Sequence, residues 1–182
     1  MYELTKSKYC RGLQCPKILW LDEHHPEFGE NIANKSVLDN GTKVGELARL
    51  YFGNCELVGF DANKNEMVDR TKKLMETADN IAEASFCYES LFCSIDILHR
   101  NDDGWDLVEV KSSTEVSEIY LEDVAFQYYV LTMCEVPVKG VYILYIDNTY
   151  VRGEQLDLKG LFVLEECTDM ALRKFSEIKS DG

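Results

Sequence analysis

The chain has 182 residues, of which 46% are hydrophobic, and its 33 acidic and 19 basic residues give a formal net charge of −14. This length predicts one domain, and no apolar run approaches the roughly 18 residues that a membrane helix needs. The acidity works against tight nonspecific binding of nucleic acid, which depends on neutralising phosphates, although a local basic patch can persist on an acidic protein.

The N-terminal residues MYELTKSKYCRG lack the apolar centre of a secretory signal. The seven cysteines are odd in number and scattered in spacing, which fits reduced thiols better than a disulfide framework. We therefore expect a soluble, cytoplasmic protein with no membrane association.

The N-terminal helical segment, about residues 1–36, is the most basic part of the chain. Residues 4–22 predict a short helix, a turn at Gly12 and a second helix that begins near Cys15 and Pro16, because proline suits the first turn of a helix. Residues 24–36 predict a loop.

Helical and strand patterns follow one another along the rest of the chain. Apolar residues repeat at helical spacing in the helices, and the strands are short apolar segments rich in β-branched and aromatic residues. The predicted elements are helices at 38–52 and 66–78, strands at 81–88, 91–98 and 105–111, a helix at 117–134, a strand at 139–147 and a helix near 167–178. The order helix, three strands, helix, strand predicts an α/β fold whose mixed central sheet is flanked by helices.

Charged residues interrupt two strands that flank a turn signal, Asn101-Asp102-Asp103-Gly104. If the turn closes about its centre, Asp96 lies opposite Glu109, whereas a tight turn at Asp103-Gly104 places Asp96 opposite Lys111. Side chains alternate along a strand, so Asp96, Glu109 and Lys111 share one face in either register. The other face, which we expect to be the core face, carries Ile95, Ile97, Val108 and Val110.

Two carboxylates at close range repel each other unless a cation lies between them. Carboxylate oxygens suit Mg²⁺ or Mn²⁺, and such an ion can lower the pKa of water and offset charge on a phosphate. With Lys111 beside Asp96 and Glu109, the pattern fits metal-dependent hydrolysis of phosphodiesters. It fits equally well a solvated hairpin face that carries three surface charges.

The segments GTKVGELAR, SID, EVKSS and AFQYYVL follow one another as in the PD-(D/E)XK nuclease superfamily. The chain resembles its RecB-like branch, which includes the CRISPR-associated exonucleases, and LTKSKYCRGLQCPKILWL is similar to the opening segment of that branch. The chain also resembles the N-terminal RecB-like domain of a bacterial protein family. The resemblance, over about residues 4–165, implies a restriction-endonuclease-like core and a single nuclease domain over residues 1–182.

The resemblance implies a role for each matching residue. Asp96 and Glu109 would bind Mg²⁺ or Mn²⁺ with the help of the Val110 carbonyl, and Lys111 would be the catalytic lysine. Glu46 lies where the RecB-like branch has a histidine or glutamate metal ligand, although its pattern alone, with Lys43 and Arg49 nearby, fits a solvated helix residue better.

Gln127 matches the glutamine of the glutamine–tyrosine motif that supports the active site in this branch, and it also fits an ordinary residue at the rim of a helix. The tyrosine of that motif usually follows four residues later, where this chain has Leu131, while Tyr128 comes earlier. The iron–sulfur relatives have three cysteines clustered near the C-terminus, where this chain has only Cys167, so an iron–sulfur cluster is not expected.

The resemblance implies DNA as the substrate, single-stranded or with an exposed end, in repair, recombination or CRISPR-type processing. The candidate nucleic-acid contacts are Lys6, Lys8, Arg11, Lys17 and Tyr128. The alternative is a non-catalytic or partner-dependent binding subunit of a larger complex, in which a protein partner supplies the basic surface that a chain of charge −14 lacks.

Overall fold

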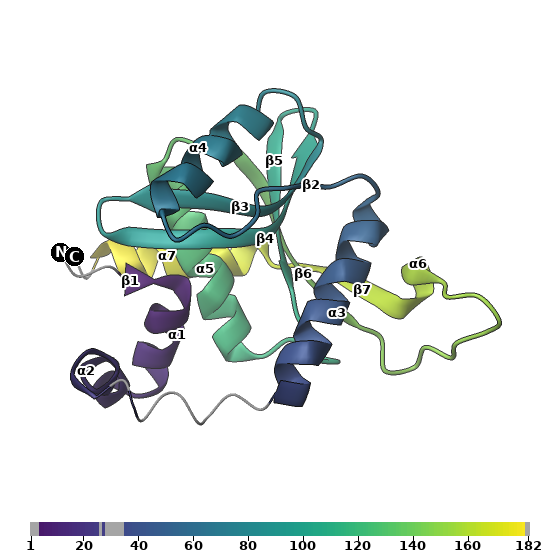
Figure 1. Cartoon of the computed structure of the whole chain (residues 1–182), viewed down its shortest axis with the longest axis horizontal. Helices are drawn as coiled ribbons and strands as arrows, with labels where there is room; N and C mark the ends of the chain where they lie inside the picture. Colours follow the sequence, from purple (N-terminus) through teal and green to yellow (C-terminus); the bar gives the residue numbers. More distant parts are fainter. Residues whose placement is uncertain (1–3, 26, 28–34, 181–182) are drawn as a thin grey trace.

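A mixed β-sheet forms the centre of the computed structural model, which describes residues 4–25, 27 and 35–180, and helices flank the sheet (Figure 1). The predicted α/β fold is therefore confirmed, including the order helix, three strands, helix, strand. The described helices are α1 (Lys6–Gln14), α2 (Pro16–His24), α3 (Lys35–Phe52), α4 (Lys64–Leu74), α5 (Glu118–Met133), α6 (Leu158–Leu161) and α7 (Thr168–Ser180). The strands are β1 (Leu4–Thr5), β2 (Glu56–Leu57), β3 (Asn80–Tyr88), β4 (Leu91–Asn101), β5 (Gly104–Val110), β6 (Val138–Ile146) and β7 (Phe162–Glu166).

The strands follow the order β2-β3-β4-β5-β6-β7, and β1 pairs with β4 outside this path. Strands β3, β4 and β5 form an antiparallel meander, and β6 pairs with β7 antiparallel. The β5–β6 pair is parallel, because α5 carries the chain back to the starting edge between the two strands.

Apolar clusters on both faces of the sheet hold the helices in place. The larger cluster includes Val124 and Val130 of α5 with Leu107 of β5, whereas the second cluster joins Val44 and Ala48 of α3 to strands β4, β5 and β6. Because side chains alternate along β5, α5 and α3 cover opposite faces there. Both helices therefore contact the strands that carry the predicted acids.

The hairpin closes about the centre of its turn. Asn101 pairs with Gly104, and Ile97 pairs with Val108, so the register is the one that places Asp96 opposite Glu109. The alternative that places Asp96 opposite Lys111 is wrong. The two acids thus lie on adjacent strands in the middle of the sheet.

The prediction that Ile95 shares a core face with Ile97 is wrong. Ile97 packs in the second cluster with Val108, but Ile95 packs in the larger cluster. The β3–β4 ladder pairs the residues on either side of Glu83, whose own φ is 59°. A left-handed residue within a strand disrupts the ladder locally and redirects the neighbouring side chains, which explains why simple alternation fails here.

Local boundaries differ in smaller ways from the prediction. Gly12 lies inside α1, and the break between the first two helices comes at Cys15, which precedes the proline that begins α2. The short strands and α6 were not predicted, because two to five residues carry too little periodic signal. Most of the loop predicted at 24–36 lies outside the described residues.

Within the described part of the chain, no helix has the length and apolar character needed to cross a membrane.

Candidate active site

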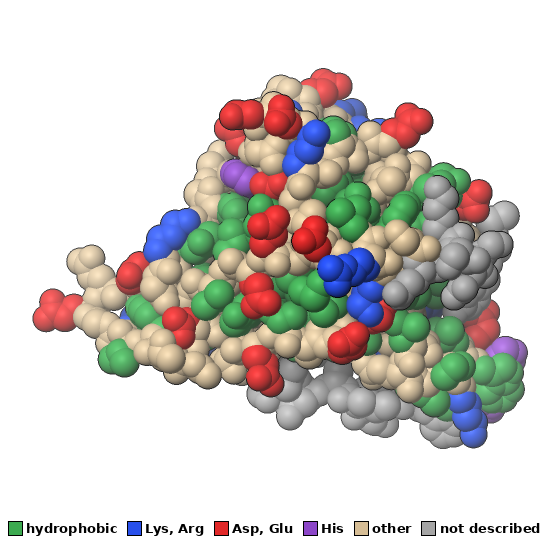
Figure 2. Space-filling model, turned by 180° about the vertical axis from the view of Figure 1, so that it is seen from behind, with side chains coloured by type: hydrophobic (Ala, Val, Ile, Leu, Met, Phe, Trp, Pro, Cys, Tyr) green, Lys and Arg blue, Asp and Glu red, His purple; other side chains and the backbone are tan. Residues whose placement is uncertain are grey.

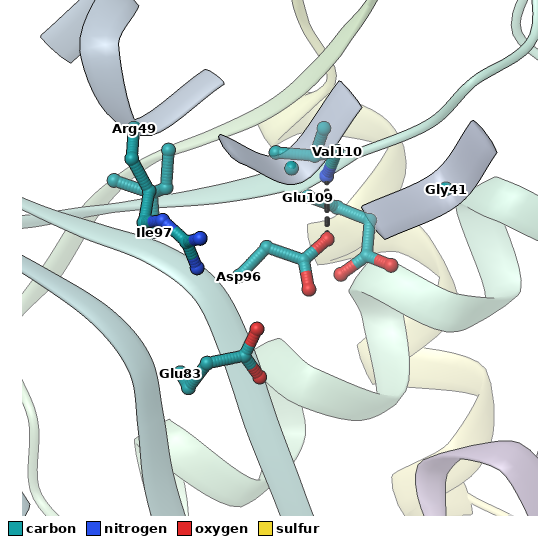
Figure 3. A pocket seen from close by; sticks show the side chains of 8 residues that line it. Gly41, Arg49, Glu83, Asp96, Ile97, Glu109 and Val110 are labelled. Atoms are coloured by element: carbon teal, nitrogen blue, oxygen red, sulfur yellow. Dashed lines mark hydrogen bonds between the residues drawn. The ribbon is translucent and has the colours of Figure 1, made fainter. Parts of the chain in front are cut away.

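A cavity of about 270 Å³ lies where the strand ladder is interrupted, between α3 and the strands β3, β4 and β5. Figure 3 shows the carboxylates of Asp96 and Glu109 next to each other, with the Glu83 carboxylate pointing towards Asp96. The wall from α3 includes two glycines, and a Cβ added at either would meet no atom within 4 Å. The cavity is lined by Gly41, Gly45, Arg49, Glu83, Asp96, Ile97, Glu109 and Val110.

Asp96 is a partly buried acid held by the neighbouring strand. Its Oδ2 accepts a hydrogen bond of 2.7 Å from the backbone N–H of Val110. Burial and the nearby charge of Glu109 raise the pKa of Asp96 to about 7, against the opposing effects of Lys6 and the Val110 hydrogen bond. The fully ionised acid pair is therefore unfavourable at neutral pH and would be stabilised by a cation.

Glu109 is almost fully buried, with 2% of its surface exposed, and its carboxylate accepts four hydrogen bonds. Lys6 Nζ donates to both oxygens at 3.1 and 3.0 Å, Lys111 Nζ donates to Oε1 at 2.6 Å, and Gln127 Nε2 donates to Oε2 at 2.7 Å. Burial alone would raise the pKa of Glu109, but the two lysines and Gln127 lower it to about 2. Glu109 is therefore the member of the pair that is ionised at neutral pH.

Asp123 completes this network and was not predicted from the sequence. Lys111 Nζ lies 2.6 Å from Asp123 Oδ2, and Gln127 Nε2 donates to Asp123 Oδ1 at 2.8 Å. Burial by itself would lower the pKa of Lys111, but the carboxylates of Glu109 and Asp123 raise it above the usual value. The amine therefore stays protonated. The sequence did contain a signal for Asp123, because it precedes Gln127 by four residues and so lies on the same face of the predicted helix.

The structure thus brings four predicted residues together, which are Asp96, Glu109, Lys111 and Gln127. It does not bring Glu46 to them, because Glu46 is exposed on α3 and does not line the cavity. The face of α3 towards the acids is formed by residues at helical spacing from one another, Gly41, Gly45 and Arg49.

The predicted nucleic-acid contacts occupy different environments. Lys6 is turned inward onto Glu109, and Arg11 forms a 2.9 Å ion pair with Asp22. Lys17 is exposed on α2, and Lys8 lies in the first helix with its side chain partly buried. Tyr128 does not line the acid cavity, and its ring packs edge-on against Phe175 of α7.

The donor set can be tested against the expected Mg²⁺ or Mn²⁺. Among residues 4–25, 27 and 35–180, no three His, Cys, Asp or Glu side chains form a group arranged to hold a metal ion. Magnesium, however, is usually bound through one or two carboxylates, with water and substrate phosphate as the other ligands. Asp96 and Glu109 supply two carboxylates at this cavity, Val110 also lines it, and the open α3 wall leaves room beside them.

Two further hollows adjoin the acid cavity, because all three share Glu83 in their walls. One is lined by Lys6, Lys64 and Asp96 among others, and the next contains Phe60, which is 90% exposed. On the face seen in Figure 2, acidic and hydrophobic side chains are interspersed with a few lysines and arginines.

The comparisons with known proteins give little to add to this geometry. No protein-family model matches the sequence, and no curated protein matches it. One solved structure with some similarity is the crystal structure of a protein called SSO0001. It is 12% identical in sequence, the match covers 89% of this chain and 84% of that chain, and the TM-score is 0.29.

Proposed function

We propose that this chain is a metal-dependent nuclease of the PD-(D/E)XK type, with a restriction-endonuclease-like core, that hydrolyses phosphodiester bonds in DNA. The observation that carries the proposal is the convergence of Asp96 and Glu109 at one cavity, with Lys111 and Gln127 both donating to Glu109. A solvated hairpin face would leave these groups exposed, but Glu109 and Gln127 are buried.

Each residue has a chemical task in this proposal. Asp96, Glu109 and the Val110 carbonyl would hold Mg²⁺ or Mn²⁺, which when bound lowers the pKa of water and offsets charge on the phosphate. The protonated Lys111 amine orients the attacking water or stabilises the negative charge that develops on the phosphate. Gln127 fixes Glu109 and Asp123 through its two N–H groups, which keeps the acid and the lysine in place.

Single-stranded DNA, or a strand end, is the substrate that we favour. The hollows next to the acids contain an exposed aromatic ring, Phe60, and a cation, Lys64. Aromatic rings can stack with unpaired bases, and cations can contact the phosphates of the same strand. Both features suit a strand whose bases are not paired.

The charge of −14 supports a second element of the proposal, which is that a protein partner supplies additional basic surface in the cytoplasm. A partner of this kind would raise the affinity for DNA without changing the chemistry at Asp96 and Glu109. The isolated chain, which has few cations to contact phosphates, would then bind DNA weakly, and the partner would make DNA binding both tighter and more dependent on salt concentration.

The proposal is tested by incubating end-labelled single- and double-stranded DNA with the protein and Mn²⁺, Mg²⁺ or EDTA. Asp96→Ala and Lys111→Ala should each reduce cleavage by about a hundredfold or more, whereas the surface change Asp103→Asn should not reduce it. Cleavage that persists in EDTA or in both variants would contradict the proposed site. Binding of DNA without cleavage under any metal would favour the non-catalytic subunit.

A further inference from the structure

Lys6 reaches the acid site from the far end of the sequence, and several contacts fix its position. The residue begins α1 directly after β1, which pairs with β4, and the Thr5 side chain caps the helix by accepting from the Lys8 N–H. One turn further on, Tyr9 stacks on Phe126 of α5 with 4.8 Å between the ring centroids. The backbone next to Lys6 is therefore held on the same helix that carries Gln127.

The Lys6 amine bridges the two oxygens of Glu109, at 3.1 Å from Oε1 and 3.0 Å from Oε2. It also lies 3.7 Å from Asp123 Oδ1, and 19% of its side chain is exposed. The position between two carboxylate oxygens is one that a bound cation takes. Glu109 does not need this amine for a hydrogen-bond partner, because Lys111 and Gln127 already donate to its two oxygens.

We propose that the Lys6 amine is an internal cation of the acid site. It binds the Glu109 carboxylate in the place of a divalent metal ion and moves away from Glu109 when the ion binds. This inference rests on the proposed metal site at Asp96 and Glu109. Its physical basis is charge: the carboxylates of Asp96, Glu109 and Asp123 face the amines of Lys6 and Lys111. When all three acids are ionised, a divalent ion added to both lysines leaves an excess of positive charge. With Lys6 moved away, the ion and Lys111 together balance the three acids.

The structure also provides a place for the displaced amine. Lys6 lines a hollow of about 310 Å³ together with Lys64 and Ser94, and this hollow shares Asp96 and Glu83 with the acid cavity. A lysine side chain has several rotatable bonds, so its amine can move into this hollow while the backbone stays in place. There it would lie beside the acids, where a phosphate of the substrate would be its new partner.

The inference is tested by measuring the affinity for Mn²⁺ by calorimetry, without nucleic acid. Lys6→Met and Lys6→Gln both remove the charge, and each should bind Mn²⁺ roughly tenfold more tightly or better than the unmodified chain. Lys6→Arg keeps the charge and should bind no more tightly than the unmodified chain. Lys139→Met removes an exposed lysine from β6 and controls for the change in net charge.

Circular dichroism melting of each variant establishes that it is folded before the titration. An Mn²⁺ affinity of Lys6→Met and Lys6→Gln equal to or weaker than that of the unmodified chain would overturn the inference and leave the nuclease proposal intact. Equal tightening in Lys139→Met would also overturn it, since net charge would then explain the effect. Absence of Mn²⁺ binding in every protein would remove the metal site itself, and both proposals with it.

Discussion

The substitution Asp96→Asn should make the protein more stable at pH values above 7 while it removes cleavage. Burial and Glu109 raise the pKa of Asp96 from 3.8 to about 7, so ionising this acid costs free energy in the folded state. At about 1.4 kcal/mol per pH unit, the difference sets an upper limit of about 4 kcal/mol. Asparagine keeps an oxygen that can accept from the Val110 N–H, but burying its amide offsets part of the gain. We therefore expect a gain of about 2 kcal/mol near pH 8.

The sign of the pH dependence distinguishes this explanation from a simple packing effect. The folded protein binds the Asp96 proton more tightly than the unfolded chain, so the contribution of Asp96 to the free energy of unfolding falls as pH rises from about 4 to about 7. The advantage of Asp96→Asn should be largest near pH 8 and should shrink towards pH 5 in urea unfolding with EDTA present. Asp103→Asn, in the exposed hairpin turn, is the matched control and should change stability by less than about 0.5 kcal/mol. If Asp96→Asn were less stable than the unmodified protein at pH 8, or if its advantage did not change with pH, the reasoning would be refuted.

Three further substitutions test the network at Gln127 and the two predicted residues, Tyr128 and Glu46, that lie outside it. Gln127→Leu removes the hydrogen bonds to Glu109 and Asp123 and should lower the free energy of unfolding by about 2–4 kcal/mol in urea, so an unchanged stability would contradict the network. Tyr128→Phe should leave kcat/KM for DNA within about twofold, and a larger loss would place the hydroxyl in the site. Glu46→Gln should leave the calorimetric affinity for Mn²⁺ unchanged, and weaker binding would restore Glu46 as a ligand.

The main elements of the fold could be predicted because each has a local signal. The turn at Asp102 and Asp103 is flanked by apolar strands, and this pattern predicted the hairpin but left two registers open, of which the structure has the one that places Asp96 opposite Glu109. Simple alternation failed at Ile95 because the conformation of Glu83, on the next strand, interrupts the ladder. The residues that neighbour Ile95 in the sequence carry no signal for the backbone conformation of Glu83.

The site was predicted only in part, for the same reason. Lys111 directly follows β5 and lies two residues from Glu109, so alternation along the predicted strand was enough to place both on one face. Lys6 contacts Glu109 across 103 residues of sequence, and the basic segment around it indicated a surface contact instead. Glu46 was predicted as a ligand by resemblance. In the structure, Gly45 lines the acid cavity and its neighbour Glu46 is exposed on α3.

Two unfavourable features coincide at one position of the sheet. Glu83 adopts a φ of 59°, which is uncommon for a residue with a side chain, and Asp96 on the adjacent strand has a raised pKa. On either side of this position β3 and β4 continue in regular register, and the adjacent apolar residues Ala82, Ala84, Ile95 and Ile97 are buried. A structural role alone would be served at lower cost by an apolar pair with ordinary backbone angles. Strain and charge repulsion concentrated at a cavity are instead typical of a site built to bind a cation or to do chemistry, and the Mn²⁺ titration addresses this directly.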